Sequence, residues 1–312
     1  MNNKSDKKIV LIKKKTRLDE LVARFNTAKQ AEFYIKHLGA DFSDYLNENK
    51  IYNQAIDNAV SMLGDFGYVQ VLERAYIPNF LFSKDDIIVV IGPDGLVVNA
   101  LKYIPQNPVI AVNPDPARFD GILLPFNIND LNKIVPEVID NKRKTKDITI
   151  AKANLSDGQT LYAVNDFFVG QRSHISARYQ IISGGINERQ SSSGVIISTG
   201  LGATGWLTSV INGVSEIAGN LLNKKLDLKV DKSFNWDSEY LYFSVREPFP
   251  GKNLKASLVF GKITKDEPLM ILSEMSENGV IFSDGIESDF LEFSSGLKAL
   301  ITIADEKGKL IV

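Results

Sequence analysis

The chain has 312 residues, of which 44% are hydrophobic and 24% are charged, and its formal net charge is −2. This length is sufficient for two domains with separate hydrophobic cores. The near-neutral charge argues against a nucleic-acid-binding protein that depends on a basic surplus. The lack of cysteine excludes disulfides and thiolate metal sites, and with only two histidines we expect no metal held by the protein itself.

The first 15 residues contain one short apolar run between two lysine clusters. This run is too short for the core of a signal peptide, and no later segment approaches the length of a membrane span. We therefore expect a cytoplasmic protein that does not bind membranes.

Up to about residue 146, predicted strands alternate with predicted helices. The strands are expected at residues 8–12, 68–72, 87–91 and 108–112, and the helices at residues 17–38, 44–63 and 129–141, with a short helix from Leu96. This alternation predicts an α/β domain with a parallel, Rossmann-like sheet. A polar, basic segment at residues 141–147 marks the predicted end of this first domain, residues 1–146.

The rest of the chain, residues 147–312, has short apolar runs separated by turn residues. Strands are expected at residues 148–153, 160–164, 175–182, 240–245, 256–260, 280–282 and 300–303, and one long helix at residues 206–222. This pattern predicts a β-rich, antiparallel C-terminal domain. The segment from about residue 290 to 312 is expected to pack back on the first domain.

The most informative stretch is the glycine turn that follows the apolar, β-branched run at residues 87–91. Such a run predicts a strand that is buried on both faces of a parallel sheet. The turn that follows, Gly92-Pro93-Asp94-Gly95, would place backbone amides and a helix N-terminus where α/β proteins bind phosphates. Asp94 is a poor anion ligand but a suitable base or hydroxyl anchor. The alternative is an ordinary connection in which Pro93 presets φ and the glycines adopt positive φ.

A long loop follows the next strand, at residues 113–126, and it contains three prolines and one glycine. Long loops that follow buried strands are often functional. Arg118 in this loop is a candidate phosphate contact, and the alternative is a solvated surface arginine.

The second domain opens with a polar pair, Asn165-Asp166, at the end of a predicted strand. The pair predicts either a turn or a ligand clamp. In a clamp, the Asn165 amide would contact a base and the Asp166 carboxylate would contact sugar hydroxyls.

A glycine-rich loop lies at residues 194–206. Its spacing, Gly200-x-Gly202-x-x-Gly205, matches the dinucleotide fingerprint, which makes an NAD(P)-dependent oxidoreductase an alternative function. The antiparallel pattern that follows lacks the parallel continuation that a Rossmann half needs. The loop also offers the hydroxyls of Thr199 and Thr204, and an indole that could stack on a base follows directly, at Trp206.

Three clusters, in this order, resemble the motifs of the NAD kinase family. In that family they are a Gly-Gly-Asp-Gly-Thr turn, an Asn-Glu/Asp pair and a Thr-Gly-Ser-Thr-Ala-Tyr-like loop; here they are residues 92–96, 165–166 and 199–206. Further segments are similar to the mitochondrial-type branch of the family, at residues 112–118, 192–194, 243–248 and 283–285.

The resemblance implies the two-domain NAD kinase architecture, with the site in the cleft between the domains, and a homodimer. It also implies transfer of the γ-phosphoryl group of ATP, with Mg²⁺, to the 2′-hydroxyl of the adenosine ribose of NAD(H), which gives NADP(H). Asp94 would bind this hydroxyl and take its proton, while the amides at Gly92 and Gly95 would carry phosphate charge. The implied NAD-binding residues are Asn165, Asp166, Ser193, Thr199, Thr204, Gly205 and Trp206.

The chain departs from the family pattern at several positions. Pro93 replaces a glycine and removes one amide donor, Leu96 replaces a threonine, and Ala203 and Gly205 stand where the family has serine and alanine. These departures keep a second hypothesis open: an NAD kinase-like nucleotide-binding protein with weak activity, or with another phosphoryl acceptor such as a lipid or a sugar.

Overall fold

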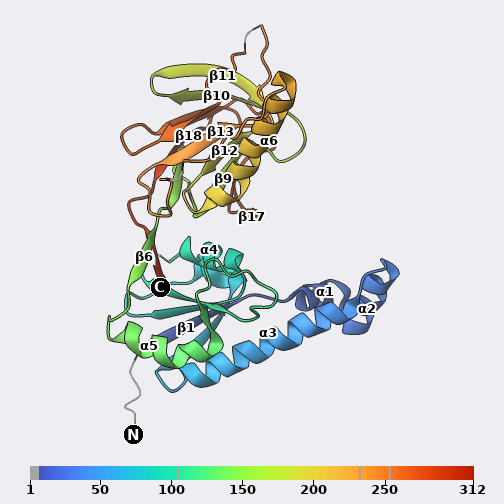
Figure 1. Ribbon diagram of the computed structural model, residues 1–312, viewed down its shortest axis with the longest axis vertical. Coiled ribbons are helices and arrows are strands. Elements are labelled where there is room, and N and C mark those ends of the chain that lie inside the picture. Colours follow the sequence, from blue (N-terminus) through green and yellow to red (C-terminus); the bar gives the residue numbers. More distant parts are fainter. Residues whose placement is uncertain (1–6, 105, 232, 253) are drawn as a thin grey trace. The chain divides into compact units, whose positions relative to one another are not determined.

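The computed structural model describes residues 7–104, 106–231, 233–252 and 254–312 (Figure 1). The chain forms two compact units. The first unit comprises the chain up to Lys146 together with Lys309–Val312, and the second comprises Asp147–Gly308.

The first unit is built on a seven-stranded sheet with the order β2-β1-β3-β4-β19-β6, in which β5 also pairs with β4. Its strands are β1 (Lys8–Lys13), β2 (Tyr68–Glu73), β3 (Ile87–Ile91), β4 (Pro108–Asn113), β5 (Phe126–Asn127), β6 (Thr145–Ile148) and β19 (Gly308–Ile311). The pairs of β1 with β2 and β3, and of β4 with β3, β5 and β19, are parallel. The parallel α/β prediction is therefore confirmed.

Helices cover both faces of this sheet. The helices of this unit are α1 (Arg17–Phe25), α2 (Ala28–His37), α3 (Phe42–Leu63), α4 (Asp94–Leu101) and α5 (Leu131–Ile139), with short 3₁₀ turns η1 (Arg74–Asn79) and η2 (Ile128–Asp130). Helices α1 and α2 pack in a separate small cluster with the start of α3. Figure 1 shows α3 and α5 on one side of the sheet and α4 on the other. Apolar side chains of α3 and α5 form one core cluster with strand residues such as Ile91 and Val112, which fixes the ends of β3 and β4.

The helix predicted at residues 17–38 is two helices. Asn26 adopts a left-handed conformation with φ of 67° and ends α1, and the Thr27 hydroxyl then accepts the Gln30 amide to begin α2. The prediction was wrong here because the apolar spacing continues across the break, while an asparagine in the left-handed conformation and a capping threonine interrupt the helical hydrogen bonds.

The second unit contains two six-stranded sheets, with the orders β11-β10-β15-β18-β7-β8 and β14-β13-β12-β9-β16-β17. The first sheet consists of β7 (Ala151–Leu155), β8 (Thr160–Ala163), β10 (Ala177–Ser183), β11 (Ile186–Ser192), β15 (Leu269–Ser273) and β18 (Lys298–Ile303). The second consists of β9 (Asp166–Gln171), β12 (Val195–Ser198), β13 (Leu241–Val245), β14 (Phe260–Ile263), β16 (Gly279–Ser283) and β17 (Ile286–Glu292).

All strand pairs within these two sheets are antiparallel, as predicted. Tyr179 from one sheet and Phe167 and Phe243 from the other are fully buried in one shared core cluster. The long helix α6 (Trp206–Leu222) follows the 3₁₀ turn η3 (Gly202–Thr204). Within the described residues, none of the helices combines the length and the apolar character needed to cross a bilayer.

The strand predicted at residues 256–260 begins only at Phe260. The buried Glu188 carboxylate accepts the amides of Ser257 and Leu258, at 3.2 and 3.0 Å, so these amides bond to a side chain rather than to a neighbouring strand. The apolar pattern could not reveal this, because the competing acceptor lies far away in the sequence.

Tyr52 provides a test of the core around β3. Its buried hydroxyl donates to the Ile91 carbonyl oxygen at 2.7 Å and accepts the Lys14 amide at 3.0 Å. Tyr52→Phe removes the hydroxyl partner of both backbone groups. We therefore expect a loss of about 1–3 kcal/mol in the free energy of unfolding, measured by urea denaturation. Tyr68→Phe, at a side chain that is 71% exposed, is the control, and equal losses in both variants would contradict the prediction.

Candidate functional site

The glycine turn lies at the end of β3. Helix α4 begins at Asp94, two residues before the predicted start at Leu96, with Pro93 as its extended N-cap residue. Neither Gly92 nor Gly95 has a positive φ, so the positive φ expected for these glycines in an ordinary connection is wrong. A Cβ atom at Gly92 would lie 2.7 Å from Leu96 Cδ2, whereas one at Gly95 would meet open space. Gly92 therefore serves packing, and the first turn of α4 is open at Gly95.

The Asp94 carboxylate is held on one side only. Its Oδ1 atom accepts the Leu123 amide at 2.6 Å, and Oδ2 makes no hydrogen bond to any residue that the structure describes. Asp94 is partly exposed, while Leu123 is buried. One oxygen is thus fixed by the loop that follows β4, and the other is available to a ligand hydroxyl.

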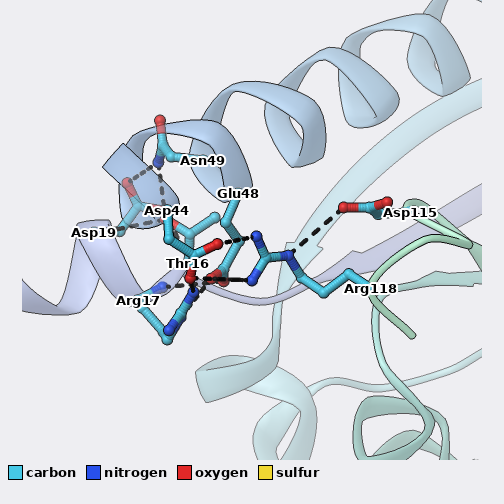
Figure 2. Close-up of polar contacts among 8 residues, drawn as sticks. All are labelled: Thr16, Arg17, Asp19, Asp44, Glu48, Asn49, Asp115 and Arg118. Atoms are coloured by element: carbon cyan, nitrogen blue, oxygen red, sulfur yellow. Dashed lines mark hydrogen bonds and ion pairs between the residues drawn. The ribbon is translucent and has the colours of Figure 1, made fainter. Parts of the chain in front are cut away.

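Arg118 lies in the same loop and faces carboxylates (Figure 2). Its Nη2 atom lies 2.5 Å from Asp44 Oδ1, Nη1 lies 3.8 Å from Glu48, and Nε lies 3.6 Å from Asp115. Arg17 binds the same two α3 carboxylates, those of Asp44 and Glu48. Hydrogen bonds from Arg118 and Arg17 hold the pKa of Asp44 well below its ordinary value. Arg118, which the sequence suggested as a phosphate contact, is therefore already paired with carboxylates of the protein.

In the second unit, Asp284 organises the predicted Asn165-Asp166 pair. Its carboxylate accepts the amides of Val164, Asn165 and Asp166, at 3.0, 2.7 and 3.4 Å, and its own amide donates to the Asp166 carbonyl oxygen at 3.0 Å. The Asn165 side-chain amide makes no hydrogen bond within the described part of the chain. Asp284 thus fixes the backbone of the pair and leaves the side chain of Asn165 available for a ligand.

Asp166 is a carboxyl group in an environment that disfavours its charge. Burial, and secondly the nearby charge of Asp284, raise the pKa of Asp166 to about 7. A carboxyl group with such a pKa can be either a donor or an acceptor near neutral pH.

Asp166 and Trp206 line one pocket of about 580 Å³ within the second unit. Four of its lining side chains are aromatic and two are arginines: Phe168, Trp206, Phe282, Phe290, Arg172 and Arg246. The Arg246 guanidinium lies 5.5 Å from the centre of the Trp206 ring, and that of Arg172 lies 4.0 Å from the centre of the Phe290 ring. The aromatic side chains offer surfaces on which a planar ring can stack, and the two arginines offer positive charge to an anionic group.

The position of the Phe168 ring in this pocket depends on two glycines. Phe168 stacks on Trp206 with 5.8 Å between ring centroids. A Cβ atom at Gly170 would lie 2.7 Å from the Phe168 ring, and one at Gly194 would overlap the ring. Gly194 also has a φ of 105°, which other residues rarely adopt.

The glycines of the loop allow close backbone packing and do not form a dinucleotide-binding turn. Cβ atoms at Gly200 and Gly202 would collide with the backbone of Asn235 and Asn165, respectively. The buried Thr199 hydroxyl donates to the Val164 carbonyl oxygen at 2.6 Å and accepts the Gly202 amide at 3.2 Å. Because β12 pairs antiparallel with both β9 and β13, the loop does not open a βαβ unit, so the structure does not support the oxidoreductase alternative.

The remaining predicted residues lie around the same loop. The Ser193 amide donates to the Arg246 carbonyl oxygen at 2.9 Å, Thr204 is exposed, and Gly205 is the N-cap residue of α6. The sequence did not indicate roles for Asp284, Arg246 or the phenylalanines of the pocket. Asp284 and Arg246 do lie in segments that carry the family resemblance, but their contacts depend on the fold.

Comparison with known proteins gives a consistent result. No family model matches the chain. NAD kinase 2, mitochondrial, from Rattus norvegicus and from Homo sapiens is 24% identical over 320 residues, with 80% of this chain and 75% and 72% of the two relatives covered.

Two solved structures share the fold. Yeast NADH kinase complexed with NADH has a TM-score of 0.60 and 16% identity, and the match covers 99% of this chain and 84% of the other. An NAD kinase from Archaeoglobus fulgidus in complex with ATP has a TM-score of 0.58 and 15% identity, and the match covers 98% and 93%.

The parallel α/β unit and the two antiparallel sheets of this chain match the two-domain architecture of these kinases. The chain thus has the fold of NAD kinases and, over most of its length, a sequence likeness to mitochondrial NAD kinases.

The raised pKa of Asp166 predicts a pH-dependent stability. Between about pH 4 and pH 7 the folded protein keeps a proton on Asp166 that the unfolded chain releases, so this contribution to stability is lost as the pH rises through 7. Asp166→Asn stays neutral and should be more stable than the parent at pH 8, by on the order of a few kcal/mol, with a smaller gain at pH 5. Thermal unfolding at both pH values measures this.

Asp305→Asn is the control for this prediction, because Asp305 is an exposed carboxylate of the same unit. We expect no comparable change in its pH dependence. If Asp166→Asn and the parent had parallel stability curves from pH 5 to pH 8, the assignment of a raised pKa to Asp166 would be wrong.

Proposed function

We propose that the protein is an NAD kinase that transfers the γ-phosphoryl group of ATP to the 2′-hydroxyl of the adenosine ribose of NAD or NADH. The observation that carries the proposal is the half-held carboxylate of Asp94, with one oxygen fixed by Leu123 and the other unbonded within the described residues. Such a group can accept the hydroxyl proton as the oxygen attacks phosphorus.

The phosphate groups of ATP are assigned to the first turn of α4. The Leu96 amide already donates to the Pro93 carbonyl oxygen at 2.8 Å, so the amides of Asp94 and Gly95 are the ones left to bind a ligand. Pro93 precedes this turn as the N-cap residue and therefore takes neither of these two donors away. The open space at Gly95 lets a phosphate approach the backbone closely.

NAD is assigned to the second unit. Asn165 offers its free side-chain amide to a base, Asp166 faces the aromatic pocket, and Trp206 offers a ring for stacking. The other four predicted residues would support NAD binding indirectly. Thr199 holds the backbone of the loop, and Ser193 bonds to the backbone of Arg246. Thr204 and Gly205 lie at the start of α6.

Mg²⁺ belongs with the nucleotide in this proposal. Within the described ranges, no group of three or more histidine or acidic residues is placed to hold a metal ion. Magnesium commonly binds one or two carboxylates together with substrate phosphates and water, so it needs no preformed cage here. When bound to ATP, the ion would neutralise phosphate charge. The homodimer and the cytoplasmic location remain predictions from the sequence.

Asp94→Asn tests the base. The amide is nearly isosteric but cannot take a proton, so we expect NADP formation from ATP, Mg²⁺ and NAD to fall by about 10²–10⁴-fold. Nucleotide affinity, measured by calorimetry, should stay close to that of the parent. Asp120→Asn, an exposed carboxylate in the loop after β4, is the control. Unchanged turnover in Asp94→Asn would exclude Asp94 as the base.

Trp206→Ala tests the NAD pocket. Loss of the stacking ring should raise the dissociation constant for NAD about 5- to 100-fold, by analogy with stacked bases, and Trp206→Phe should retain most of the affinity. Titration calorimetry with NAD checks both variants. Equal affinity of Trp206→Ala and the parent would place NAD elsewhere. If the parent bound ATP and NAD but made no NADP(H), another phosphoryl acceptor would be indicated.

A further inference from the structure

Two arginines bind the same pair of carboxylates on α3 (Figure 2). Arg17 Nη2 lies 2.6 Å from Asp44 Oδ2, and Arg118 Nη2 lies 2.5 Å from Asp44 Oδ1. Glu48, which is buried, contacts both guanidinium groups. The two arginines are therefore close electrostatic equivalents, but they belong to different segments: Arg17 begins α1, and Arg118 lies in the loop after β4.

The loop after β4, which contains Arg118 and Leu123, is bonded internally through the side chain of Asn113. The Asn113 side chain accepts the Asp115 amide at 3.0 Å and donates to the Phe119 carbonyl oxygen at 3.1 Å. Gly121, with a φ of 69°, packs against the Asn113 amide, because a Cβ atom there would lie 2.8 Å from Asn113 Nδ2. Arg118 and Leu123 thus belong to one short, internally bonded segment.

The other end of this segment holds Asp94. Leu123 and its neighbour Leu124 are 3% and 5% exposed, and the Leu123 amide donates to Asp94 Oδ1 at 2.6 Å. No other hydrogen bond to the Asp94 carboxylate comes from the described residues. The orientation of this carboxylate therefore depends on where the loop places one amide.

We propose that Arg118 is a positioning residue for Asp94: its ion pairs with Asp44, Glu48 and Asp115 fix the loop after β4, and the loop fixes the Asp94 carboxylate. The catalytic part of this inference rests on the proposed function. It replaces the expectation that Arg118 contacts phosphate, because a guanidinium that already faces three carboxylates adds little attraction for a triphosphate.

A matched pair of variants tests the inference. Arg118→Met and Arg17→Met each remove one guanidinium from the same carboxylates and keep an unbranched side chain of moderate length. Arg118→Met should lower kcat about 10- to 100-fold, because small displacements of a catalytic group are costly, while KM for ATP stays within about twofold. Arg17→Met should leave kcat near the parent value, and Arg118→Lys, which keeps the charge but not the fork, should be intermediate.

Hydrogen–deuterium exchange of peptides covering residues 113–126 provides a measurement that needs no activity. We expect about two- to tenfold faster exchange in Arg118→Met, with the β3 peptide unchanged, and no such change in Arg17→Met. A higher KM for ATP with an unaltered loop would show that Arg118 is a phosphate contact and overturn the inference. Equal effects of the two variants on kcat and on the loop would also overturn it.

The two proposals fail separately. A parent protein that forms no NADP(H) would refute the proposed function, and the exchange measurement would still decide whether Arg118 holds the loop. Conversely, an active parent with identical kcat in Arg118→Met would refute the positioning role and leave the NAD kinase proposal intact.

Discussion

The hydrogen bond from the Leu123 amide to Asp94 is the contact on which the proposed chemistry depends. It exists because β3 and β4 are parallel neighbours, so the turn after one and the loop after the other emerge at the same edge of the sheet. A carboxylate in a solvated turn would rotate freely. Here one oxygen is committed to the backbone, so the position of the other is defined before any substrate arrives.

The second unit also depends on hydrogen bonds between a carboxylate and backbone amides, but there the carboxylate orients the amides. In the first unit a single amide orients a carboxylate, whereas the Asp284 carboxylate orients three successive amides and thereby sets Asn165 and Asp166. The charge of Asp284 contributes, after burial, to the raised pKa of its neighbour Asp166. The two neighbouring acids thus differ in their hydrogen bonds: the Asp284 carboxylate accepts three backbone amides, whereas Asp166 lines the pocket.

Local patterns identified much of this molecule and failed where long-range contacts decide. The apolar run of β3 and the turn around Asp94 were predictable because strand and turn are specified by adjacent residues. The break at Asn26 and the delayed start of β14 at Phe260 were missed, since a left-handed residue and a distant carboxylate override the apolar pattern. Two of the three carboxylates that face Arg118 lie on α3, and Asp284, beside Asp166, lies in the turn after β16, so these contacts could not be predicted from local spacing.

The strand order of the first unit has a consequence for how the chain folds. Strand β19 lies between β4 and β6, so the sheet that carries Asp94 has a gap that only residues from the far end of the chain fill. During synthesis, the second unit is complete before this last strand emerges. Until β19 is available, the sheet of the first unit would be incomplete and β4 would be an open edge strand. Insertion of β19 would then be a slow, late step of high contact order.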